Sequence, residues 1–282
     1  MQAIDTLHLG RRRWICCWQV GEVLVDPGPT LSLDTVLDAL DGWQPQAILL
    51  THIHFDHAAS TGTLMRRFPD VELYVHERGA PHMVNPERLW ASASRLYGED
   101  NMLAMWGEFE PVPEERMHVL KGGETLTIAG DTFEVAYTPG HAKHHVSYLH
   151  DGTAFVGDVG GVRIEAGLPV LPPTPPPDID LEAWHRSVAL LRDWKPERLA
   201  ITHFGLSEEP DAQFDELETR LDQWAEEART QDRDGWVAAV EADLRRATTP
   251  ETFDSFIAAV PVDQSYAGLR RYWEKRADRG ST

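Results

Sequence analysis

The segment Thr51–His57 constrains this chain more than any other, because it places three histidines and an aspartate within six positions. These four residues are His52, His54, Asp56 and His57. They directly follow the apolar run 47–50, which reads as a buried strand, and strand ends are where α/β sheets bind ligands. In a short loop the side chains of His52 and His54 point in one direction, and those of Asp56 and His57 point in another. Because imidazole and carboxylate groups are common metal ligands, the segment predicts a site for two ions.

Three further strand-like segments each end on a residue of the same kinds. The segments 133–137, 153–156 and 199–201 are rich in apolar residues, and each leads through a short turn into a ligand-type side chain. The three side chains are His141, Asp158 and His203. A lone histidine is usually an ordinary surface or core residue. Four strand ends that all carry ligand types make metal binding the better interpretation.

This ordered set, together with the run Val25-Asp26-Pro27-Gly28, resembles the metallo-β-lactamase-fold hydrolase superfamily over residues 1–205. The resemblance implies an α/β protein, an αββα sandwich built from two similar halves and followed by a C-terminal helical extension. The implied ligands are His52, His54 and His141 for the first ion, Asp56, His57 and His203 for the second, and Asp158 as the bridge. Asp26 matches the superfamily's structural aspartate, which organises the loops beneath the site and binds no metal.

The resemblance is strongest to the branch that contains glyoxalase II and the acyl-homoserine lactonases, which implies hydrolysis of a small ester, thioester or lactone. Two divalent ions can lower the pKa of a shared water towards about 7, and Asp56 is the catalytic candidate for proton transfer. Nitrogen and carboxylate donors favour zinc and also accommodate iron or manganese. The alternatives are an iron enzyme resembling the persulfide dioxygenases, a phosphodiesterase or nuclease, and a metal-stabilised binding protein.

Residues 79–111 interrupt the implied sandwich and are typical of a helical insertion. Asn85-Pro86-Glu87 is a good helix start, and apolar residues follow at helical spacing. These side chains can pack against the body of the protein. They can also form a lid over the metals, in which case Trp90 and Tyr97 line the substrate pocket. Both roles are compatible with different faces of one helix.

Residues 206–282 predict a C-terminal helical extension with several apolar stripes. Residues 222–243 are expected to form one mainly acidic helix. Glyoxalase II uses basic residues of its own helical domain to bind glutathione, so the acidic character here argues against that ligand. Contacts between two copies of the chain, giving a homodimer, are another role for these helices.

Composition excludes several other classes of function. With 26 basic and 46 acidic residues the formal net charge is −20, and such a surface repels a phosphate backbone, so no nucleic-acid partner is expected. No apolar run approaches the ~20 residues of a membrane span, and the N-terminus lacks the apolar core of a signal peptide. The only two cysteines, Cys16 and Cys17, are adjacent and expected to be buried reduced thiols. We therefore expect a cytoplasmic enzyme that acts on a small molecule.

Overall fold

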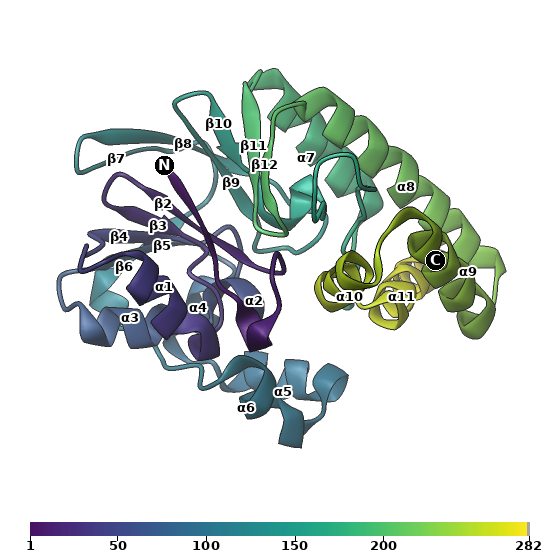
Figure 1. Cartoon of the computed structure of the whole chain (residues 1–282), viewed down its shortest axis with the longest axis horizontal. Coiled ribbons are helices and arrows are strands. Elements are labelled where there is room, and N and C mark those ends of the chain that lie inside the picture. Colours follow the sequence, from purple (N-terminus) through teal and green to yellow (C-terminus); the bar gives the residue numbers. More distant parts are fainter. Residues whose placement is uncertain (281–282) are drawn as a thin grey trace.

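The computed structural model describes residues 1–280 and contains two six-stranded sheets packed face to face, with helices on both outer surfaces (Figure 1). This arrangement confirms the αββα sandwich. The helices α1 (Leu33–Ala39), α3 (Thr61–Arg67) and α4 (Ala80–Val84) lie on one side, and α7 (Leu181–Asp193) and α8 (Pro210–Thr230) lie on the other. The two sheets are formed by the two halves of the chain in turn.

The first sheet follows chain order from β1 to β6. Its strands are β1 (Gln2–Asp5), β2 (Cys16–Val20), β3 (Val23–Val25), β4 (Ala47–Leu49), β5 (Glu72–His76) and β6 (Met117–Leu120). The first three strands pair antiparallel, and the pairs from β3 to β6 are parallel. Parallel pairing needs crossover segments, and the metal-site loop forms part of the crossover after β4.

The second sheet has the order β12-β11-β10-β9-β8-β7. Its strands are β7 (Thr125–Ile128), β8 (Asp131–Tyr137), β9 (Val146–His150), β10 (Thr153–Phe155), β11 (Arg198–Ile201) and β12 (Gly205–Ser207). Only β10 and β11 pair in parallel, and α7 is the crossover between them. The ends of β8, β10 and β11 are the strand ends that carry ligand-type residues.

Strand periodicity divides the apolar side chains between two cores. On β2, the side chains of Cys16, Trp18 and Val20 lie in the cluster between the sheets, whereas Cys17 belongs to the larger cluster under the helices. Successive side chains of a strand point to opposite faces, so one strand serves both layers. Trp18 meets Phe155 of the opposite sheet edge to face, with ring centroids 6.0 Å apart. Both cysteines are buried free thiols, as predicted.

The remaining helices are short connectors and the two helical regions expected from the sequence. They are η1 (His8–Gly10), η2 (Thr30–Ser32), α2 (Phe55–Ala58), α5 (Glu87–Tyr97), α6 (Glu99–Trp106), η3 (Glu114–Arg116), η4 (Gly157–Gly160), α9 (Arg233–Ala247), α10 (Pro250–Ala259) and α11 (Val262–Gly280). In Figure 1 the pair α5 and α6 projects from the body of the molecule, and α9 to α11 gather beside the far end of α8.

The prediction of one helix over residues 222–243 is wrong. The helix α8 ends at Thr230 and α9 begins at Arg233, because the Asp232 side chain accepts a hydrogen bond from the Gly235 backbone at 2.8 Å and caps a new helix. The break lets α11 pack against both α8 and α9. Within residues 1–280, none of the helices is long and apolar enough to cross a membrane.

Candidate metal centre

All seven residues that the sequence predicts as ligands come together at one edge of the sandwich. The loop after β4 supplies His52 and His54, and the short helix α2 supplies Asp56 and His57. The other three lie just beyond β8, β10 and β11, on the second sheet. They form two groups, His52, His54, His141 and Asp158 in one and Asp56, His57 and His203 in the other.

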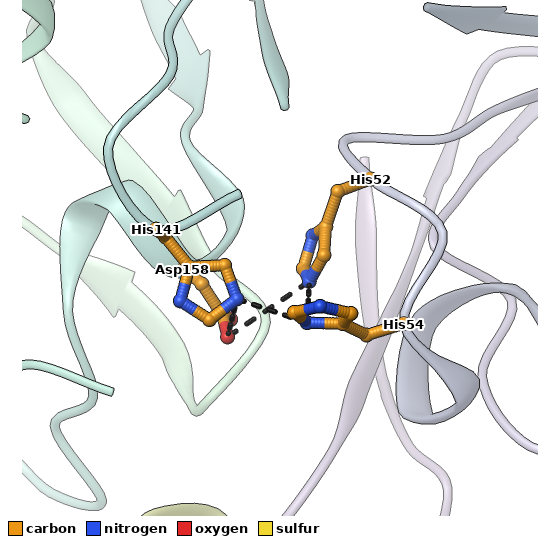
Figure 2. A group of neighbouring side chains, drawn as sticks. All are labelled: His52, His54, His141 and Asp158. Atoms are coloured by element: carbon orange, nitrogen blue, oxygen red, sulfur yellow. Dashed lines mark hydrogen bonds and ion pairs between the residues drawn. The ribbon is translucent and has the colours of Figure 1, made fainter. Parts of the chain in front are cut away.

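In the first group three imidazole nitrogens converge on one point, and Figure 2 shows these rings and the Asp158 carboxylate turned toward one another. His54 Nδ1 lies 3.0 Å from His52 Nε2 and 3.0 Å from His141 Nε2. Tetrahedral coordination at about 2.0–2.1 Å places two ligand nitrogens roughly 3.3 Å apart. The spacing of the three nitrogens therefore fits a small divalent cation between them.

The Asp158 carboxylate lies between the two groups. Its Oδ2 is 3.2 Å from His141 Nε2 in the first group, and its Oδ1 is 3.2 Å from His57 Nε2 in the second. His203 Nε2 lies 3.5 Å from the same Oδ1 and 3.3 Å from Asp56 Oδ2. One carboxylate thus presents an oxygen to each group, which is the geometry that a bridging ligand requires.

The tautomers of the histidines are fixed by acceptors behind them. His141 Nδ1 donates to the Pro173 carbonyl at 2.8 Å, and His203 Nδ1 donates to the Trp14 carbonyl at 2.6 Å, because a carbonyl can only accept. His57 Nδ1 donates to the Asp26 carboxylate at 2.8 Å. In the neutral form of each ring the proton therefore sits on Nδ1, and Nε2 presents a lone pair to the centre.

Three of the atoms that face the second group are buried and have no hydrogen-bond partner. They are His57 Nε2, His203 Nε2 and Asp158 Oδ1. Buried polar atoms without partners are costly, and lone pairs that face one another repel. A cation bound among these three atoms satisfies all of them. The residues present therefore fit a divalent metal in the second group as well as in the first.

The Asp26 carboxylate organises this centre from beneath. It is fully buried and accepts from the Thr51 backbone at 2.8 Å, the Thr51 hydroxyl at 2.6 Å and the Thr202 hydroxyl at 2.9 Å, in addition to the His57 ring. Each of these donors adjoins a ligand in sequence or is one. Asp26 thereby fixes the loops after β4 and β11 relative to each other.

Gly157 allows the second sheet to approach the first at this point. It has a φ of +44°, and a Cβ there would lie 2.5 Å from Thr51 Oγ1 and 2.7 Å from His145 Nε2. Any larger residue would push apart the loops that carry His52 and Asp158. Glycine at this position is a steric requirement of the centre.

The protonation of the two groups differs. Burial lowers the pKa of His52 well below its usual range and lowers the pKa of His54 to about 4, so both rings are neutral near pH 7. For His57 and His203, burial also acts against the charged form. The carboxylates of Asp158 and Asp56 outweigh burial there and raise the pKa of both rings. Protons therefore compete with a metal more strongly in the second group.

A cavity of about 590 Å³ opens directly beside the centre, and His54, Asp56, His141 and Asp158 form part of its wall. Tyr97 of α5 also lines this cavity. Trp90 does not line it but packs against Phe55, with ring centroids 5.7 Å apart. Of the two aromatic residues predicted to line the pocket, Tyr97 thus lies in its wall and Trp90 lies behind it.

Several residues of the site were missed by the sequence predictions. Thr51 and Thr202 carry a recognisable signal, since each precedes a ligand histidine at a strand end as a Thr-His pair. The backbone carbonyls of Trp14 and Pro173 carry no sequence signal, because every residue has a backbone carbonyl. Residues 257–261 and Gln264 of the C-terminal helices also line the cavity, and their position there depends on tertiary packing.

The fold and this double group of ligands define a class, an αββα protein with side chains positioned to hold two divalent cations. The family model of the metallo-beta-lactamase superfamily matches residues 21–203. The chain belongs to the metallo-beta-lactamase superfamily. The matched residues include all seven predicted ligands as well as Asp26.

Among similar proteins, a metallo-beta-lactamase fold-containing protein of Sulfurisphaera tokodaii is 28% identical over 199 residues, which are 68% of this chain and 72% of that protein. A hydroxyacylglutathione hydrolase of Xanthomonas campestris pv. campestris is 34% identical over 153 residues, 52% of this chain and 46% of that protein. A crystal structure of an archaeal superfamily protein from Sulfolobus tokodaii has a TM-score of 0.72 at 23% identity and covers 95% of this chain and 97% of its own. That likeness concerns the fold and extends over the C-terminal helices.

We predict that Asp26→Ala destabilises the protein by at least about 3 kcal/mol, because it leaves several buried donors without their charged acceptor. Metal affinity should also fall by about 10-fold to 100-fold, although Asp26 is not a ligand. Thermal melts and elemental analysis measure both effects. Asp38→Ala, at an exposed position of α1, is the matched control. A variant at Asp26 with the melting temperature and metal content of the wild type would contradict this role.

We also predict that acid removes the two ions in sequence. His57 and His203 have raised pKa values and bind protons at a higher pH than His52 and His54, so the second group loses its ion first as the pH falls. Metal content measured between pH 8 and pH 5 should decline from two ions to one and then to none. His203→Ala, which lacks one of the three ligands of the second group, should bind a single ion in the first group and keep it until the lower step. Loss of both ions in one step would count against this difference.

Proposed function

We propose that this chain is a metal-dependent hydrolase that uses two divalent ions to cleave a small ester, thioester or lactone. The observation that supports the proposal most strongly is the pair of ligand groups that share Asp158 at the wall of a cavity. Superfamily membership and the similarity to a relative named as a hydrolase support the same reaction class.

Bound divalent ions at this centre would lower the pKa of a water towards about 7 and polarise the carbonyl group of the substrate. The protein residues then have to position the substrate and move protons. Asp56 is the residue best placed to move protons, because its side chain is 21% exposed and lines the cavity. The side chain of Asp158 is only 6% exposed.

Asp56 can carry a proton from the attacking water to the leaving group. Burial acts to raise the pKa of its carboxyl, but the His57 and His203 rings outweigh burial and hold the pKa below its usual range. The group is therefore a carboxylate at neutral pH, with Oδ2 turned toward His203 and the rest of the side chain open to the cavity. This state suits a general base that acts in the first step and returns the proton in the second.

Tyr97 is our candidate for a polar contact with the substrate. Burial raises the pKa of its phenol, so the hydroxyl stays protonated and can donate a hydrogen bond to a substrate oxygen. Trp90 supports the same wall from behind through Phe55. We assign it an indirect part in substrate binding.

Zinc is the metal that the donor set favours. The first group offers three imidazoles and one carboxylate oxygen, a combination that zinc binds tetrahedrally. Iron and manganese accept the same donors, so the donor set alone allows them too. A persulfide-dioxygenase-like reaction would require iron, and oxygen dependence therefore separates the two chemistries.

The prediction for the reaction class concerns oxygen. A hydrolysis needs no redox change, so zinc-loaded protein should cleave esters, thioesters or lactones at the same rate with and without oxygen. The rate should fall as the pH is lowered, because protons compete for the ligands of the second group. Activity is assayed in an anaerobic chamber and in air with the same protein. Oxygen uptake on a persulfide that depends strictly on iron, with no hydrolysis of the three carbonyl classes, would overturn the proposal.

A further inference from the structure

The cavity beside the metal centre lies between two parts of the chain that are far apart in sequence. One wall comes from α5 and α6 of the insertion, with Leu89, Leu96 and Met105. The opposite wall comes from the end of α10 and the start of α11, with Ile257 and Val260. The metal ligands occupy only one end. The remainder of the cavity is therefore free to hold a part of the substrate that does not react.

The side chains of this remaining part are mainly apolar. Trp14 and Trp106 add two indoles to the aliphatic residues of both walls, and Pro173 and Pro175–Pro177 line it from the proline-rich segment. A cavity of about 590 Å³ is within the range of roughly 300–1,000 Å³ that takes a sizeable organic ligand. An apolar surface of this size is larger than an acetyl group could cover.

The charged side chains of the cavity outside the metal centre balance one another. Arg11 and Arg88 line it, and so do Asp178 and Asp254. Asp178 is in addition paired with Lys143 at 2.9 Å. With Lys143 included, three cationic side chains face two carboxylates, an excess of one positive charge that could neutralise at most one carboxylate of a substrate. A substrate with several carboxylates is therefore disfavoured, and the apolar lining favours an uncharged group.

The apolar surface continues to the protein exterior. Two leucines that line the cavity are exposed, Leu9 at 51% and Leu96 at 38%. Exposed leucines beside a pocket are consistent with a partner or ligand that covers them. Inside, two polar side chains line the cavity, Tyr97 from α5 and Gln264 from α11.

We infer that the substrate is an acyl compound with an uncharged apolar chain or aryl group of roughly six to ten carbons, which lies between the insertion and the α10–α11 junction. This inference rests on the proposed hydrolase function and specifies its substrate class. The carbonyl carbon lies at the metal centre, and the chain extends from it toward Leu96 and Ile257. Selectivity for chain length is therefore set by residues that do not touch the metals.

The first test uses the wild-type protein and p-nitrophenyl esters from acetate to decanoate. Burial of each added CH2 in the cavity should raise kcat/KM by up to about fourfold until the cavity is full. Binding is measured separately with butanamide, hexanamide and octanamide through the change in intrinsic tryptophan fluorescence, because two of the ten tryptophans, Trp14 and Trp106, line the cavity. Kd should fall along this series as well, and this readout does not depend on catalysis.

The second test changes the walls. Ile257→Trp should narrow the cavity and reduce the ratio of kcat/KM for octanoate over acetate by at least about 10-fold, and Leu96→Ala should reduce it by a smaller factor through lost contact. Leu190→Trp, at a 39% exposed position of α7 away from the cavity, is the control and should keep the wild-type ratio. If Ile257→Trp fails to fold in a thermal melt, the wild-type series and Leu96→Ala still test the inference.

The outcomes separate this inference from the hydrolase proposal. Hydrolysis with a flat or falling dependence on chain length, together with equal binding of all three amides, overturns the inference and leaves the hydrolase in place. Binding that strengthens with chain length, without hydrolysis of any ester, thioester or lactone, supports the apolar site and overturns the hydrolase. An unchanged octanoate-to-acetate ratio in both wall variants would also reject the assigned walls.

Discussion

The structure of the metal centre depends on one buried carboxylate. Asp26 stands at the end of β3 with a φ of +49° and is fully buried. Burial of a charge costs several kcal/mol unless it is compensated, and here Thr51, His57 and Thr202 donate to it. Charge-assisted hydrogen bonds of this kind are short and strong. Because the donors come from both sheets, the bonds that stabilise the buried charge also hold the two sets of ligands in register.

Behind the centre, neutral acceptors set the tautomers. The carbonyls of Trp14 and Pro173 each accept the Nδ1 proton of one histidine, so that Nε2 of the neutral ring is left as the ligand nitrogen. Three buried atoms that face the second group have no hydrogen-bond partner, and two imidazoles there have raised pKa values. The first group instead holds neutral rings. The two halves of one centre thus differ in how strongly protons oppose metal binding.

Much of the site could be predicted from the sequence because its residues sit where strands end. The run Thr51–His57 and the residues after β8, β10 and β11 carry short local signals, and the resemblance supplied the sandwich and the pairing of ligands into two groups. The carbonyl partners and the α10–α11 wall could not be found this way, since they depend on how distant segments pack. The break between α8 and α9 was missed because it depends on the hydrogen bond from the Gly235 backbone to the Asp232 side chain. The acidic composition of residues 222–243 does not indicate that bond.

The most direct test of this account is anomalous X-ray diffraction from crystals of zinc-loaded protein, because it locates each ion without reference to activity. The account predicts two anomalous peaks about 3.5–4 Å apart, with the Asp158 carboxylate between them. One peak should lie among His52, His54 and His141, and the other among Asp56, His57 and His203. A single peak in fully loaded crystals, or two peaks away from these side chains, would contradict the central claim of a two-ion centre.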